Sequence, residues 1–243
     1  MTERELLIKG LEQICPKVYP QTVDNFLKFS DMLLEKNKVM NLTAVTEPME
    51  VISRHFLDCA MIAPDIISEE KVIDIGTGAG FPGLPLAILC EDTQFVLIDA
   101  LRKRIDFLNE VISELGLKNV TAIHARAEEL KERQSFSAAV SRAVADLSVL
   151  SELTLPLVKV GGKFIAMKAQ DCKDEVSKAT KAIEILGGTK PVIKTYTVVQ
   201  SDIVRAKVEI QKIKDTPSKY PRRFAKISAS PPVSYTHLTL PTT

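Results

Sequence analysis

The segment Val72-Ile-Asp-Ile-Gly-Thr-Gly-Ala-Gly-Phe-Pro-Gly83 contains two overlapping glycine patterns that predict different ligands. From Gly78 to Gly83 it reads G-x-G-x-x-G, the pattern of loops that bind dinucleotides. From Asp74 to Gly80 it reads as an acidic residue near a strand end, followed by three alternating glycines. The first pattern predicts a nicotinamide or flavin enzyme, and the second a protein that binds a positively charged cofactor. The surrounding sequence has to decide between them.

Short apolar runs on both sides of this segment alternate with amphipathic stretches of helical period. Repeated strand–helix units form a parallel sheet with helices on both faces. The last two strands have no helix between them, so they must pair antiparallel. We therefore predict an α/β fold with a mostly parallel seven-stranded sheet and one antiparallel edge strand. The expected strands are 72–75, 95–99, 120–124, 138–141, 163–167, 192–199 and 206–213, and the expected helices are 82–90, 102–115, 147–158 and 174–186.

The two ends of the chain differ from this central pattern. Residues 1–68 are predicted to form a helical N-terminal extension, with a polar turn at 37–43. The cofactor-binding domain is then expected at 69–226. From Ile227 onward, ISASPPVSYTHLTLPTT contains no Lys, Arg, Asp or Glu and has no periodic face. Residues 227–243 are therefore interpreted as a non-native or disordered tail and excluded from the fold.

Composition excludes several classes of protein. No apolar run reaches the ~20 residues of a membrane span, and the N-terminus lacks the apolar core of a signal peptide. The four cysteines are scattered without a C-x-x-C pair, so neither a metal site nor a disulfide framework is expected. The 243 residues carry a net charge of +1. A soluble, cytoplasmic and monomeric protein without a metal is predicted.

The charge of the glycine segment favours a cationic cofactor. A dinucleotide needs free N–H groups at the helix start for its pyrophosphate. There Pro82 removes a donor, and Asp74 adds a negative charge. The sulfonium and ammonium groups of S-adenosylmethionine are instead attracted by a carboxylate, directly or through water. Asp99 ends the second strand, where its carboxylate can accept both ribose hydroxyls. The alternative for both acids is that they only cap nearby N–H groups. The residues favour S-adenosylmethionine, with Gly76, Gly78 and Asp99 as contacts.

Two later strand ends supply further candidates. After the third strand, Ala127 and Glu128 can contact the exocyclic amine of an adenine. After the fourth, Arg142 stands where the methyl group would be presented, because ligands bind beyond the carboxyl ends of the strands. Arg142 is expected either to form an ion pair with Glu128 or Asp74 or to meet an anionic substrate. His55 is interpreted as a structural histidine beside Arg54 and Asp58.

A basic segment follows the sheet. Residues 203–226 hold eight Lys or Arg against two acidic residues. Such a run is either a solvated face or an interface with nucleic acid. Lys219-Tyr-Pro-Arg-Arg223 combines cations with an aromatic ring, which suits phosphate contact and base stacking. Arg222 and Arg223 are therefore candidate RNA contacts.

Seven motifs occur in order along the chain: NLTAV from Asn41, SRHFLDC from Ser53, DIGTGAGFPGLPLAI from Asp74, DALRKRIDFL from Asp99, RAEEL from Arg126, SRAVA from Ser141 and KYPRR from Lys219. Together they resemble the bacterial RsmG (GidB) family of small-subunit rRNA methyltransferases. The resemblance implies a Rossmann-like class I methyltransferase fold. It also implies methyl transfer from S-adenosylmethionine to N7 of a guanine in 16S rRNA, with 16S rRNA or the small ribosomal subunit as partner.

Residue by residue, the resemblance implies cofactor contacts at Gly76, Phe81, Ala127, Glu128 and Arg142. Arg54 and Lys168 join Arg222 and Arg223 as candidate RNA contacts. The chain departs from the family pattern at Ala169, where glycine is more usual after the lysine, and in the ending FAKISAS. No catalytic acid or base is assigned, because the N7 lone pair is free at neutral pH.

Three other functions fit parts of the pattern. A small-molecule methyltransferase would share the cofactor loop but would have no use for the basic segment. A non-catalytic RNA-binding or assembly factor could keep the fold without binding S-adenosylmethionine. A dinucleotide enzyme would explain the G-x-G-x-x-G pattern alone.

Overall fold

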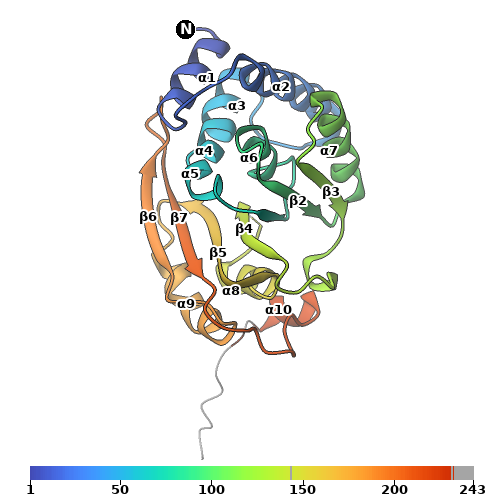
Figure 1. The fold of residues 1–243 in the computed structure, drawn as a ribbon, viewed down its shortest axis with the longest axis vertical. Helices are drawn as coiled ribbons and strands as arrows, with labels where there is room; N and C mark the ends of the chain where they lie inside the picture. Colours follow the sequence, from blue (N-terminus) through green and yellow to red (C-terminus); the bar gives the residue numbers. More distant parts are fainter. Residues whose placement is uncertain (143, 231, 233–243) are drawn as a thin grey trace, which may run out of the picture.

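The computed structural model describes residues 1–142, 144–230 and 232, and its centre is one seven-stranded sheet (Figure 1). Strands β1 to β5 pair in parallel, whereas β7 is antiparallel to both of its neighbours. The predicted fold class is confirmed. The reversed strand lies one place in from the edge, between β5 and β6. In spatial order the strands are β3 (Val120–His124), β2 (Gln94–Asp99), β1 (Lys71–Ile75), β4 (Phe136–Arg142), β5 (Val158–Ala169), β7 (Val204–Gln211) and β6 (Val192–Thr197).

Helices cover both faces of the sheet, and alternate side chains of each strand enter opposite cores. On β1, Val72 packs into the core beneath the N-terminal helices, whereas Ile73 packs into the core beneath α8 and α9. Figure 1 shows α1 to α7 on one side of the strands and α8 to α10 on the other. The helices after β1 are α6 (Gly83–Leu89), α7 (Arg102–Leu115), η2 (Ala127–Glu129), α8 (Leu147–Thr154), α9 (Lys173–Ile185) and α10 (Phe224–Ala229).

Before β1 the described chain is helical, and it shares its core with the sheet. Phe26, Phe29 and Phe56 are fully buried in one cluster with Val72 and Phe95. The N-terminal segment therefore packs as one layer of the fold. Its elements are α1 (Glu3–Glu12), α2 (Pro20–Met40), α3 (Pro48–Val51), the π-helix η1 (Ile52–Leu57), α4 (Asp58–Ala60) and α5 (Ala63–Ile66). Among the described residues, no helix combines the length and apolar character that crossing a membrane requires.

The end of α2 differs from the sequence prediction. The helix continues through the expected turn to Met40, and Asn41 then adopts a left-handed conformation with φ of 48°. The side chain of Asn37 stabilises this exit, because its Oδ1 accepts from the backbone N–H groups of Leu42 and Thr43 at 2.6 and 2.9 Å. Asn37, one of the polar residues that indicated a turn, therefore lies inside α2 and caps its C-terminal end.

The boundary between α8 and β5 also differs. Helix α8 ends at Thr154 instead of reaching Val158, because Pro156 has no backbone N–H with which to continue the helical hydrogen bonds after Leu155. Strand β5 already begins at Val158, and Gly161 and Gly162 lie inside it at a register shift. A Cβ on Gly162 would lie 2.5 Å from the carbonyl oxygen of Ser137, so the neighbouring strand requires glycine there.

The predicted start of the tail, Ile227, lies within a folded helix. Helix α10 spans Phe224–Ala229, and Ile227 is completely buried in the second core. The fold therefore continues past residue 226. Of the predicted tail, residues 231 and 233–243 lie outside the described residues.

The turn from β1 to α6 is held by one buried carboxylate. Oδ2 of Asp74 accepts from Thr77 Oγ1 at 2.6 Å and from the backbone N–H of Gly83 at 2.9 Å. A Cβ on Gly83 would lie 2.7 Å from that oxygen, so the contact requires glycine at the start of α6. Asp74 thus joins the strand, the glycine loop and the helix.

We predict that Asp74 makes the stability of the protein depend on pH. Burial raises the pKa of the Asp74 carboxyl to about 7, from an ordinary value of 3.8. Between those values the folded chain keeps a proton that the unfolded chain has lost, so the contribution of Asp74 to stability falls as pH rises. The free energy of unfolding of the wild type, minus that of Asp74→Asn, should decrease by on the order of 2 kcal/mol from pH 5 to 7.5. Urea denaturation at both pH values measures this; an unchanged difference would contradict it.

Candidate functional site

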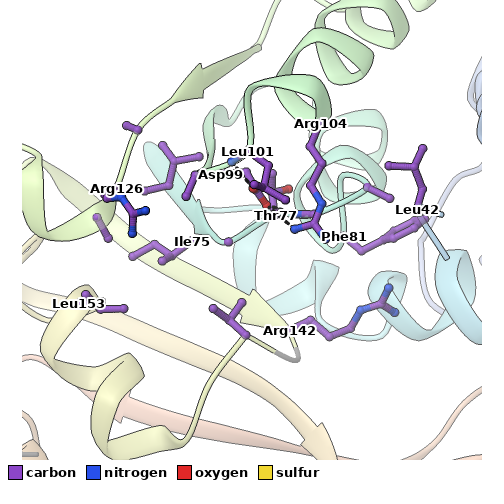
Figure 2. A pocket seen from close by; sticks show the side chains of 18 of the residues that line it. Leu42, Ile75, Thr77, Phe81, Asp99, Leu101, Arg104, Arg126, Arg142 and Leu153 are labelled. Carbon is purple, nitrogen blue, oxygen red and sulfur yellow. Dashed lines mark hydrogen bonds and ion pairs between the residues drawn. The ribbon is translucent and has the colours of Figure 1, made fainter. Parts of the chain in front are cut away.

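A cavity of about 480 Å³ lies at the carboxyl ends of β1, β2, β3 and β4. All seven predicted cofactor contacts line it: Gly76, Gly78, Phe81, Asp99, Ala127, Glu128 and Arg142. Figure 2 shows Arg126 and Leu153 toward one end of this cavity, Phe81 and Arg142 toward the other, and Asp99 with Arg104 between them. We call it the first cavity. It lies where ligands of open parallel sheets bind.

Asp99 is the acidic group of the first cavity. Its side chain is almost fully buried, and Oδ1 accepts from the backbone N–H of Leu101 at 2.8 Å. Oδ2 accepts from the backbone N–H of Gly78 at 3.0 Å and from Arg104 Nη1 at 3.1 Å. These bonds hold the carboxylate in place. Because each carboxylate oxygen has two lone pairs, Oδ1 can still accept from a ligand.

The backbone N–H groups of the glycine loop are almost all used inside the protein. Those of Gly76 and Thr77 donate to Ile98 O, and those of Gly80 and Phe81 donate to Thr77 O. At the helix start, the Gly83 N–H is held by Asp74, as described above. A pyrophosphate would need such donors free. The loop geometry therefore disfavours a dinucleotide.

Asp74 itself does not line the first cavity. It is completely buried under the loop, where it caps the N–H of Gly83. Asp74 therefore has the role of the alternative interpretation, a carboxylate that caps a nearby N–H group. Asp74 disfavours the binding of a pyrophosphate because it already accepts from the Gly83 N–H at the helix start, in addition to any effect of its charge.

Arg142 lies at the end of the first cavity opposite Arg126 (Figure 2). Its Nη1 lies 3.3 Å from Asp58 Oδ2, and its guanidinium lies 4.8 Å from the centre of the Phe81 ring. Asp58 also accepts from the Tyr196 hydroxyl at 3.0 Å. The expected ion pair of Arg142 is therefore present, but its partner is Asp58 instead of Glu128 or Asp74.

His55 lies beside Arg142, on the π-helix η1. Its Nε2 lies 2.7 Å from Thr43 Oγ1, and its ring lies 4.6 Å from that of Phe81. Burial, and secondarily the Arg142 guanidinium, lowers the pKa of His55 to about 4. The imidazole is therefore neutral at pH 7. His55 also lines the first cavity, and its interpretation as a structural histidine stays a prediction.

Sequence reasoning missed several residues of the first cavity. Leu101 and Arg104 follow Asp99 in the same turn, so their spacing from the acidic residue could have indicated them. Phe224 comes from α10, in the part of the chain that departs from the family pattern, and no local pattern indicated it. The missed lining residues include Leu42, Thr43, Leu101, Arg104, Arg126, Val144, Leu153 and Phe224.

None of the four candidate RNA contacts lines the first cavity. Arg54 is half-exposed and pairs with Glu50 at 3.3 Å. Arg223 is exposed and has no ion-pair partner within the described residues. Lys168 is largely buried, and its Nζ donates to Glu175 Oε1 at 2.6 Å and to the Ala145 carbonyl at 3.0 Å.

Arg222 forms a buried ion pair. Its Nε and Nη2 donate to the two carboxylate oxygens of Glu152, which is fully buried, at 2.9 and 2.5 Å. Tyr220, the expected stacking ring, is itself buried in the second core. The geometry therefore weighs against RNA contacts by Arg222 and Tyr220, because both side chains are committed inside the protein.

A family model described as rRNA small subunit methyltransferase G matches residues 22–204. A protein of that name from Clostridium tetani is 46% identical over 212 residues, which cover 85% of this chain and 89% of the relative. One from Clostridium perfringens is 42% identical and covers 93% of this chain and 98% of the relative.

Solved structures agree with the fold. A SAM-dependent O-methyltransferase from Thermotoga maritima gives a TM-score of 0.53 at 16% identity, over 76% of this chain and 73% of that chain. A SAM-dependent methyltransferase from Aquifex aeolicus gives 0.51 at 18% identity, over 73% of this chain and 97% of that chain. At these identities the likeness shows the fold alone. The family model and the close relatives, however, span most of the sequence, and the chain therefore belongs to the rRNA small subunit methyltransferase G family.

Proposed function

We propose that this chain transfers a methyl group from S-adenosylmethionine to N7 of a guanine in 16S rRNA. One observation carries the proposal. In this chain, which belongs to the family, the first cavity combines an acidic residue, an open glycine loop and few free N–H donors. Relatives named ribosomal RNA small subunit methyltransferase G support rRNA as the substrate.

The residues of the first cavity fit S-adenosylmethionine. Gly78 has a φ of 61°, and a Cβ on it would meet no atom closer than 4.0 Å, so this side of the loop is open to a ligand. Asp99, Ala127 and Glu128 all line the first cavity. The Asp99 carboxylate would accept ribose hydroxyls, and Ala127 and Glu128 would contact the adenine. When bound, S-adenosylmethionine would supply a sulfonium methyl group, whose C–S bond breaks as the N–C bond to N7 forms, with the electron pair staying on sulfur.

The role of the protein is then to position the reactants and exclude water. No proton has to leave N7, so no general base is required. The ion pair with Asp58 holds the Arg142 guanidinium on the Phe81 ring and so shapes the end of the first cavity. Alignment of this kind supplies much of the rate enhancement in bimolecular transfers.

Of the candidate RNA contacts, we retain the two exposed ones, Arg54 and Arg223, for phosphate contact. A guanine in a helix presents N7 in the deep, narrow major groove of RNA. The target base must therefore be unpaired, or leave its stack, before it reaches the enzyme.

We predict that Asp99→Asn weakens S-adenosylmethionine binding roughly 10- to 100-fold. A hydrogen bond to a charged group is worth about 1.5–3 kcal/mol, and 1.4 kcal/mol is a factor of ten in affinity. Isothermal titration calorimetry gives the Kd. Asp106→Asn is the matched control, because Asp106 is exposed on α7 and does not line the first cavity. Equal affinities of the two variants would remove Asp99 from the binding site.

The methyl transfer itself is tested by mapping N7-methylguanine in unmodified 16S rRNA after incubation with the protein and S-adenosylmethionine. Deproteinised rRNA and small-subunit particles serve as parallel substrates. We expect a new N7-methylguanine in at least one of them, and none when the cofactor is omitted. Absence of the modification from both, with S-adenosylmethionine binding intact, would sink the rRNA assignment.

A further inference from the structure

Phe224 is an aromatic residue that the fold holds at the first cavity without burying it. It begins α10 and lines the cavity, yet 40% of its surface is exposed. Among the described residues, it belongs to neither of the two hydrophobic cores. Packing inside the protein therefore does not account for a large apolar ring at this position, and the ring is available to a ligand in the cavity.

The segment around Phe224 is anchored on both sides. Two residues before it, the backbone N–H of Arg222 donates to Glu152 Oε1 at 2.8 Å, in addition to the ion pair of the Arg222 guanidinium. Three residues after it, Ile227 is completely buried. The backbone of Phe224 therefore has a defined place, whereas its ring is left at the cavity.

The ring belongs to the end of the first cavity where an adenine is expected. Helix α10 packs against α8, and α8 contributes Leu153 to the end of the cavity that Arg126 marks (Figure 2). Ala127 and Glu128, the proposed adenine contacts, directly follow Arg126 in the chain. Phe224 and Leu153 therefore form an apolar wall on the adenine side of the cavity.

An adenine ring suits such a wall. Its two faces are flat and apolar, whereas its polar atoms lie along its edges. Aromatic side chains stack on the faces of bases, and this contact does not require a hydrogen bond. The contacts proposed for Ala127 and Glu128 use an edge of the adenine, so they leave its faces to side chains of this kind.

We propose that Phe224 packs on a face of the adenine of S-adenosylmethionine and covers that end of the first cavity. The inference rests on the proposed function, because it takes S-adenosylmethionine as the cofactor. The buried pair of Arg222 and Glu152 then anchors the segment that carries the ring. The ending that departs from the family pattern thus serves the cofactor site.

Substitution of Phe224 tests the contact through cofactor affinity, with no methylation required. We expect Phe224→Ala to raise the Kd for S-adenosylmethionine about tenfold in isothermal titration calorimetry, because the stacking contact with the base is lost. S-adenosylhomocysteine has the same adenine but no sulfonium, so its Kd should rise by the same factor. Phe224→Tyr keeps a ring and should restore the wild-type Kd. An effect on S-adenosylmethionine alone would indicate a contact with the sulfonium and overturn the adenine assignment.

A tryptophan at the same position reports the contact directly. The chain contains no tryptophan, so Phe224→Trp gives the protein a single fluorophore of this type. Its emission should change on titration with S-adenosylmethionine, with a Kd close to that of the wild type. Ala225→Trp is the matched control, because Ala225 is exposed on the same helix and does not line the first cavity. The emission of this control should stay constant.

The proposal is overturned if Phe224→Ala binds both ligands as tightly as the wild type, or if the emission of Phe224→Trp does not respond while calorimetry detects binding. Unchanged affinity with slower N7-methylguanine formation at saturating cofactor would assign the ring to rRNA, and also overturns it. Failure of the proposed function is recognised separately. A wild type that binds neither ligand removes the cofactor assignment and this inference together, and a wild type that binds both but forms no N7-methylguanine removes only the rRNA assignment.

Discussion

The buried carboxylate of Asp74 is the constraint on which the first cavity depends. Its Oδ2 holds Thr77 in the loop and the N–H of Gly83 at the start of α6. These two bonds set the direction in which the chain leaves β1, and with it the places of Gly78 and Phe81. The bonds also consume a donor that an anion would otherwise use. One acidic residue outside the cavity therefore shapes the chemistry of the cavity.

A second carboxylate, Asp58, joins the N-terminal helices to the far half of the sheet. It contacts Arg142 at the end of β4, Tyr196 on β6 and Arg205 on β7. An isolated buried charge is costly, so the Asp58 carboxylate needs these partners close to it. Each partner is in turn held in place by its contact with Asp58. The N-terminal helices are therefore part of the site, because His55 and Thr43 reach the first cavity only from this layer.

Much of the fold was predictable because local patterns dominate it. The limits of α7 agree with the expected helix, and Gly116 ends it in a left-handed conformation. All seven expected cofactor contacts line one cavity, because the ends of parallel strands meet at one edge of the sheet. Predictions from charge were less successful. Lys212, counted in the basic segment, is completely buried, and its Nζ donates to the carbonyls of Leu155 and Leu186 at 2.7 and 3.0 Å.

The sequence by itself determined the alternation of strands and helices, the glycine loop and the acidic ends of two strands. These features depend on residues within one turn or one strand of each other. Only the tertiary structure decided which charged side chains are paired inside the protein. Arg222 meets Glu152 across 70 positions, and Tyr196 meets Asp58 across 138. Ion pairs and hydrogen bonds between such distant segments form only when packing brings them together and removes water, so no local pattern could separate the internal cations from the exposed Arg223.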